Sequence, residues 1–197
     1  MSPITAAKRM AYNLWPQARR AITSLQPVVP VEGLGTLAVD KHWRLYYDPE
    51  YVSGDNFKEP GITILHELLH LLWGHCGRGE NMLGQNPSPQ ARRVWNIVCD
   101  LKVNRALRVE ELPVPDEWVD CCYVNQMCAE LTGDSTNFDM ITRQMEAQWS
   151  VERIFNLIMQ RIKHEQAESG NQGGNDGVHG EAEQSGGLSG GEQHHEG

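Results

Sequence analysis

In most of the segments that are rich in apolar residues, the apolar positions recur every three to four residues, the period of an α-helix. Between residues 4 and 15 apolar side chains recur at helical spacing behind Ser2 and Pro3, a typical helix start, and Pro16 should divide this segment before a second helical stretch. Residues 62–75 are apolar on nearly every face, which predicts a helix that is buried on most sides. Further helices are expected over residues 90–108, in part over 118–130, and from 150 to about 163.

The β signal is confined to a short region. Residues 36–39 and 43–47 are rich in β-branched and aromatic residues and flank Asp40, which predicts a hairpin. The glycines and prolines between Gly74 and Pro89 predict a loop beside the buried helix. Together these elements indicate an α+β fold that is mainly helical, with a small hairpin or sheet.

Charge is concentrated at the C-terminal end of the sequence. The net charge is -9, but residues 165–197 hold seven acidic residues and no Lys or Arg, which leaves 19 acidic against 17 basic residues in 1–164. Residues 165–197 also contain almost no apolar side chain, so we expect a disordered acidic tail after a single domain formed by residues 1–164. The nearly neutral domain has no broad basic surface, which argues against nucleic acid as a partner.

Neither a signal peptide nor a membrane span is evident, because no window approaches the roughly 20 apolar residues that a span requires. The sequence therefore predicts a cytoplasmic protein with no membrane partner. The five cysteines lack the paired spacing of a structural zinc site, so reduced thiols are expected. Cys76 and Cys99 are minor candidates for metal ligands because they are close in sequence to the site described next.

The buried segment contains the pattern His66-Glu67-Leu68-Leu69-His70. Two histidines four residues apart on a helix project from one face, so both imidazoles can reach one metal ion. In the zinc-hydrolase interpretation of this pattern, Zn²⁺ is bound by His66 and His70, and Glu67 is the general base. The alternative is a core helix whose histidines are satisfied by hydrogen bonds and whose Glu67 pairs with an arginine.

A catalytic zinc usually has three protein ligands, and two residues compete for the third position. Asp100 stands on the predicted second helix between Asn96 and Asn104, at a spacing that forms a polar stripe. His75 follows His70 by five residues and would need the helix to break first. We favour Asp100, and expect the residue that is not a ligand to hold a ligand imidazole by its free ring nitrogen. The stripe alternatively provides hydrogen bonds between helices without metal.

Several motifs taken together resemble a known family. They are the stretch from His66 to Arg78, the stretch from Trp95 to Asn104, the pair Leu112-Pro113, and the stretch from Ser150 to Phe155. This combination is similar to the bacterial and phage putative metallopeptidase domain that commonly precedes a von Willebrand factor A-like domain, and it covers about residues 5–160. Here the acidic tail stands in place of that second domain, so no partner function of the second domain is carried over.

The resemblance implies a zincin-like fold with an active-site helix and a second ligand helix. It also implies a zinc-dependent peptidase site at His66, Glu67 and His70. Further positions that match the family pattern are His75, Arg78, Asn96, Asp100 and Asn104.

We therefore expect a zinc metallopeptidase that acts on a protein or peptide. One strand of the hairpin would align the substrate by backbone pairing. The oxyanion stabiliser stays open among Arg78, Tyr46, Tyr47 and Tyr123. The alternatives are a noncatalytic zincin-like module that binds a protein partner, and a structural metal site.

Overall fold

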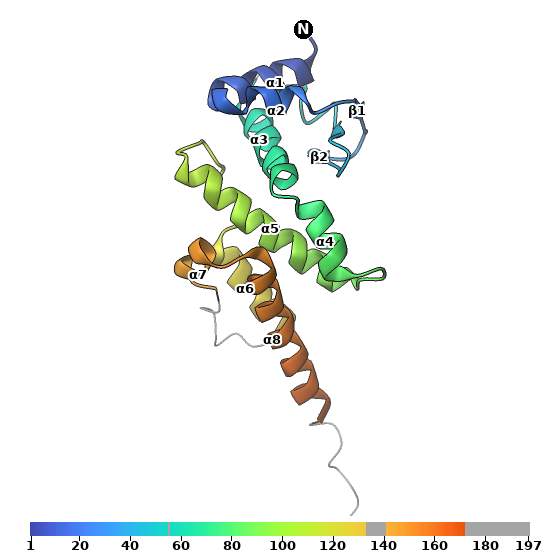
Figure 1. The fold of residues 1–197 in the computed structure, drawn as a ribbon, viewed down its shortest axis with the longest axis vertical. Coiled ribbons are helices and arrows are strands. Elements are labelled where there is room, and N and C mark those ends of the chain that lie inside the picture. The colour runs from blue at the N-terminus through green and yellow to red at the C-terminus, as the bar shows by residue number, and fades with distance from the viewer. Residues whose placement is uncertain (55, 133–140, 172–197) are drawn as a thin grey trace, which may run out of the picture.

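The computed structural model describes residues 1–54, 56–132 and 141–171, and it is mainly helical with a small mixed sheet (Figure 1). The N-terminal helix α1 (Pro3–Leu14) starts directly after Ser2 as expected, and Pro16 separates it from the 3-10 turn η1 (Pro16–Ala18) and the short helix α2 (Arg19–Thr23). The predicted α+β class with mainly helical content is confirmed.

The sheet contains three strands in the described part of the chain, in the order β1-β3-β2. Strands β2 (Leu37–Val39) and β3 (Leu45–Tyr47) pair in antiparallel fashion, which confirms the predicted hairpin. Strand β1 (Val28–Pro30) pairs in parallel with β3 and was not predicted, because its flanking prolines are depleted in strands. Consequently β2 has one edge that no other strand of this sheet covers.

Helix α3 (Lys58–Leu72) carries the His66 motif, and it starts four residues before the expected segment. Gly74 ends it in a left-handed conformation with φ 66°, a conformation that glycine adopts without a Cβ penalty. The prediction of a loop after Gly74 is wrong for its first half, because residues 75–83 form helix α4 (His75–Leu83). Gly79 explains this difference: a Cβ there would lie 2.6 Å from Nε1 of Trp95, so glycine allows α4 to pack closely on its neighbour.

Helix α5 (Pro89–Val109) agrees with the predicted second helix, and Ser88 caps it by accepting a hydrogen bond from the Ala91 amide. Its side chains enter two hydrophobic cores. Val103 and Leu107 pack with α1, α2, α3 and the sheet, whereas its N-terminal half packs with α6 (Cys121–Thr132) and α8 (Val151–Asn171). In Figure 1, α5 accordingly crosses between these two groups of elements.

The C-terminal elements differ from the expected boundaries. The short helix α7 (Arg143–Gln148) was not predicted, and most of the expected turn-rich loop lies outside the described residues. Helix α8 continues to Asn171, so residues 165–171 are helical where a disordered tail was expected. Ion pairs at helical spacing extend it, such as Arg161–Glu165 at 2.6 Å. Residues 172–197, the rest of the expected tail, are outside the description.

Across the described ranges, no helix combines the length and the apolar character that crossing a membrane requires.

Candidate metal centre

Helices α3 and α5 bring together three side chains of the kinds that can bind a metal ion. The Nε2 atoms of His66 and His70 lie 2.9 Å apart. Oδ1 of Asp100 is 3.1 Å from Nε2 of His70 and 3.4 Å from Nε2 of His66. The four-residue spacing places the two imidazoles on one face of α3, and the packing of α3 against α5 supplies the carboxylate.

These atoms fit the donor set of a zinc ion. Ligands bound tetrahedrally at about 2.1 Å from zinc are about 3.4 Å from one another, close to the observed separations. The side chains of His66 and His70 are 12% and 15% exposed, and that of Asp100 is 32% exposed. The group is therefore open to solvent mainly on the Asp100 side, where an additional ligand such as water has access.

Asn104 fixes the orientation and the tautomer of His66. Its amide Nδ2 donates to the carbonyl of Val119 at 3.1 Å, and its Oδ1 lies 2.8 Å from Nδ1 of His66. Because Oδ1 can only accept, Nδ1 of His66 carries the proton. In the neutral ring this leaves the lone pair of Nε2 directed at the shared point, as metal binding requires.

His75 is on the other side of His70, away from Asp100. Its Nδ1 lies 3.1 Å from Nδ1 of His70. Burial, with smaller contributions from the charges of His70 and Arg78, lowers the pKa of His75 to about 3, so the ring is neutral and its Nδ1 can accept a hydrogen bond from Nδ1–H of His70. The structure thus brings Asp100, and not His75, next to the two Nε2 atoms. Nε2 of His75 is buried and has no hydrogen-bond partner among the described residues.

Glu67 lies beside the group on the side of the sheet. Burial raises the pKa of its carboxyl above the ordinary value, although the charges of His66 and His70 and the Val39 amide act in the opposite direction. In the part of the chain that the structure describes, no arginine forms an ion pair with Glu67, which disfavours the alternative of a structural pair. A raised pKa is closer to neutral pH, and a general base transfers protons most effectively when its pKa is near the working pH.

The pKa of Asp100 is shifted in the opposite direction to that of Glu67. Burial raises its pKa, but the neighbouring imidazoles of His66 and His70 outweigh burial and hold the pKa below its ordinary value. The carboxylate is therefore ionised at neutral pH, as a metal ligand must be.

Two clefts meet at this group. The first, which we call the His66 cleft, has a volume of about 490 Å³ and includes His66, Glu67, Asp100 and Asn104 in its lining. Its other walls are Gly35, Thr36, Leu37, Tyr51, Glu59, Thr63, Glu117, Trp118, Val119 and Tyr123. The second, the His75 cleft, has a volume of about 410 Å³ and is lined by His70, His75 and residues of α4 and α5.

Other residues singled out from the sequence fall outside the metal group. The Asn96 side chain lines the His75 cleft and forms no hydrogen bond within the described ranges, so of the two asparagines only Asn104 contacts one of the two paired imidazoles. Cys76 and Cys99 line the same cleft as free thiols, and the metal-competent group at this site contains neither of them.

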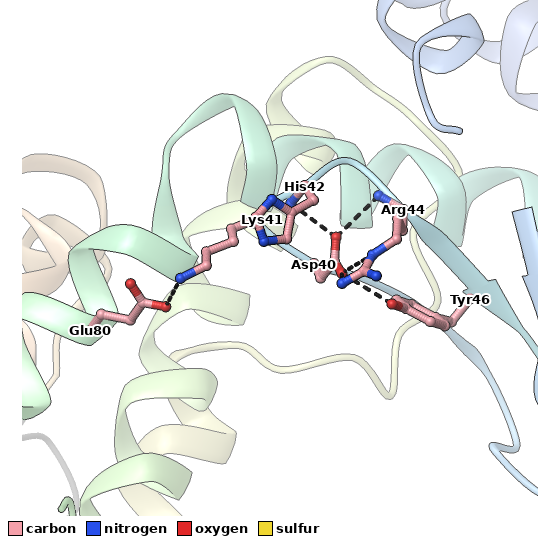
Figure 2. A network of polar contacts seen from close by, with 6 residues as sticks. All are labelled: Asp40, Lys41, His42, Arg44, Tyr46 and Glu80. Carbon is pink, nitrogen blue, oxygen red and sulfur yellow. Dashed lines mark hydrogen bonds and ion pairs between the residues drawn. The ribbon is translucent and has the colours of Figure 1, made fainter. Parts of the chain in front are cut away.

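The surroundings of the candidate oxyanion stabilisers show which of these side chains are engaged elsewhere and which face the cleft. Arg78 donates to both carboxylate oxygens of Glu152 at 2.7 and 2.9 Å, so its guanidinium is already engaged. The Tyr46 hydroxyl donates to Asp40 at 3.0 Å (Figure 2). Tyr47 is partly buried against the core that α1, α2, α3 and the sheet share. Tyr123 lines the His66 cleft and is 42% exposed, which makes it the available candidate of the four.

The hairpin is tied to α4 on the outer side of the site. Figure 2 shows Asp40 accepting bonds from the amides of His42 and Arg44 and from the Arg44 guanidinium, which closes the turn between β2 and β3. Lys41 then pairs with Glu80 of α4 at 2.7 Å. These contacts fix the turn between β2 and β3 and hold it against α4.

Sequence reasoning missed the aromatic and acidic walls of the His66 cleft. Trp118 stands edge-on to the His66 ring with 5.1 Å between centroids, and Tyr51, Glu59 and Glu117 also line the cleft. They come from a helix start and from irregular segments without a periodic pattern. No spacing signal in the sequence relates them to the histidines.

Comparison with protein families gives a match over nearly the whole chain: a family model described as a putative metallopeptidase domain covers residues 4–196. No curated protein and no solved structure matches the chain.

Proposed function

Because the chain belongs to this family of putative metallopeptidase domains, we propose that it is a zinc-dependent peptidase that cleaves a protein or peptide substrate. One observation carries the proposal: Nε2 of His66, Nε2 of His70 and Oδ1 of Asp100 converge beside Glu67 at the wall of a cleft. His66, His70 and Asp100 would hold the metal. Zn²⁺, when bound, supplies Lewis-acid polarisation of the scissile carbonyl and acidifies a water molecule.

Glu67 performs the proton transfers in this mechanism. Its carboxylate takes a proton from the attacking water and then delivers it to the nitrogen of the leaving amine. Asn104 keeps the proton of His66 on Nδ1, so that Nε2 stays available at the shared point. His75 provides the acceptor for Nδ1 of His70 in the same way.

The edge of β2 is the proposed place for the substrate backbone. Thr36 and Leu37 line the His66 cleft, and β2 is at the end of the sheet order. An extended peptide can add to such an edge by main-chain hydrogen bonds. This arrangement would carry the scissile bond past Glu67, whose carboxylate is stabilised by the Val39 amide of the same strand.

Two variants test the proposal. Glu67→Gln should retain stoichiometric zinc, measured by elemental analysis, and lose cleavage of a peptide library. His66→Ala should lose both zinc and cleavage. Zinc-bound Glu67→Gln protein that still cleaves peptides at the wild-type rate would rule out this mechanism. A wild-type protein that binds zinc but cleaves no peptide in the library would favour a binding module instead.

A further inference from the structure

The far wall of the His66 cleft is an irregular segment, residues 115–119, that α5 holds in place. The Arg108 guanidinium donates to the carbonyls of Pro115 at 3.3 Å, Trp118 at 3.2 Å and Val119 at 3.4 Å. Asn104, one turn earlier on α5, donates to the same Val119 carbonyl at 3.1 Å. The helix that presents Asp100 therefore also fixes this wall relative to the metal group.

The wall presents an aromatic surface to the cleft. Trp118 lines it, and its ring is held edge-on to His66 at an interplanar angle of 77°. Tyr51 and Tyr123 line the cleft as well. Aromatic rings of this kind accommodate the aliphatic stem of a long side chain and attract a cation at their faces.

The ionisable Asp and Glu side chains make the lining of the His66 cleft negatively charged. Four carboxylates line it, on Glu59, Glu67, Asp100 and Glu117, and its lining includes no Lys or Arg. A divalent cation held by the metal group would balance Glu67 and Asp100 and leave Glu59 and Glu117. Both are exposed, and neither forms an ion pair with a Lys or Arg within the described residues. The His75 cleft differs, because both Arg92 and Glu80 line it.

We propose that the His66 cleft selects a substrate residue with a long basic side chain, lysine or arginine. The aliphatic stem would lie on Trp118, and the charge would reach Glu59 and Glu117. The inference rests on the proposed peptidase function for the position of the substrate backbone. Its independent basis is a cleft that joins the metal group to a fixed aromatic wall and to two carboxylates that form no ion pair with Lys or Arg in the described ranges; Glu59 accepts only a long hydrogen bond from the Tyr51 hydroxyl, at 3.4 Å.

Matched peptides test the selection. A peptide library carries lysine, norleucine or glutamate at one position at a time, so that the three peptides differ in charge at nearly constant length. For the zinc-loaded protein we expect kcat/KM to be about five- to tenfold higher for the lysine peptide than for the norleucine peptide at the selected position, typical of partly exposed charge pairs. Glutamate should be the poorest residue.

Two charge-neutralising variants locate the selection. Glu117→Gln and Glu59→Gln should each reduce the lysine preference by roughly threefold and leave cleavage of the norleucine peptide nearly unchanged. Glu110→Gln is the matched control, because it removes the same charge from an exposed residue that does not line the cleft. An equal loss in the control would show that net charge, and not the cleft, causes the preference.

Binding separates this inference from the proposed function. The same peptides are titrated calorimetrically into the zinc-loaded Glu67→Gln protein, where turnover is not required. Preferential binding of the lysine peptide supports the inference, whether or not the wild type cleaves it. Equal binding of the three peptides, or no binding, overturns the inference even if the wild type cleaves peptides. Absence of cleavage with selective binding would overturn only the peptidase proposal.

Discussion

Replacing Asn104 by leucine tests how the second helix controls the metal group. Asn104 is 1% exposed and joins Nδ1 of His66 at 2.8 Å to the carbonyl of Val119 at 3.1 Å. Leucine removes both bonds. It leaves a buried N–H on His66 without a partner, and it leaves the Val119 carbonyl with only the longer bond from Arg108 at 3.4 Å. Each unsatisfied buried group costs about 1–3 kcal/mol, and loss of the bond also frees His66 to place its proton on Nε2.

The expected result is a weaker metal site in a folded protein. Partners that orient a metal-bound histidine are worth about 10- to 100-fold in metal affinity, equivalent to about 1.4–2.7 kcal/mol. We therefore expect zinc to bind Asn104→Leu at least tenfold more weakly than the wild type in competition with a chelating dye. Circular dichroism and thermal melting of the metal-free proteins measure the separate loss of stability.

Two further variants sharpen this test. Asn96→Leu is the control, because Asn96 is exposed on the same helix and its side chain forms no hydrogen bond in the described part of the chain. Asn104→Asp keeps an acceptor for His66 but loses the donor to Val119, so it should retain more zinc affinity than leucine. A folded Asn104→Leu protein with zinc affinity within about threefold of the wild type would refute the role assigned to Asn104.

Three other predictions concern stability. The Arg78 hydrogen bonds lower the pKa of Glu152 from 4.5 to about 2, so their contribution is complete above pH 4.5 and is lost as the pH falls toward 2. Because both side chains are about one-third exposed, Glu152→Gln should flatten the acid limb of the stability curve by only about 1 kcal/mol in denaturant titrations, and an unchanged limb would contradict the pair's contribution. Gly79→Ala should lower the free energy of unfolding by about 1–3 kcal/mol, because the added Cβ would collide with Trp95. Gly77→Ala should raise it slightly, because the added Cβ meets open space and alanine favours the helix. Equal effects of the two variants in thermal melts would contradict this packing. Zinc at 100 times its Kd should stabilise the wild type by about 2.7 kcal/mol in the same melts, and a chelator should reverse the shift.

Local periodicity accounts for the part of the site that could be predicted. The four-residue spacing of His66 and His70 places them on one helix face wherever the helix lies, because the geometry of an α-helix sets the angle between them. The spacing of Asn96, Asp100 and Asn104 likewise predicted a stripe on one face of the next helix. The metal identity, the ligand roles and the role of Glu67 remain proposals.

Helix α4 shows the limit of local propensity. Three glycines in residues 74–79 indicated a loop, since glycine is an unfavourable residue inside a helix. The chain is helical from His75 because close packing of Gly79 on Trp95 of α5 offsets that cost. This contact joins residues 16 positions apart in a way that no short sequence window contains.

The sequence by itself determined the helical class, the hairpin and the pair of imidazoles, because each depends on neighbours within a few residues. The tertiary structure alone decided that Asp100 and not His75 lies beside the two Nε2 atoms, and that Asn104 rather than Asn96 contacts His66. It also decided that Trp118 and the acidic residues Glu59 and Glu117 share a cleft with them. These juxtapositions follow from how α3, α5 and the 115–119 segment pack, and packing depends on side-chain shape across the whole core rather than on sequence spacing.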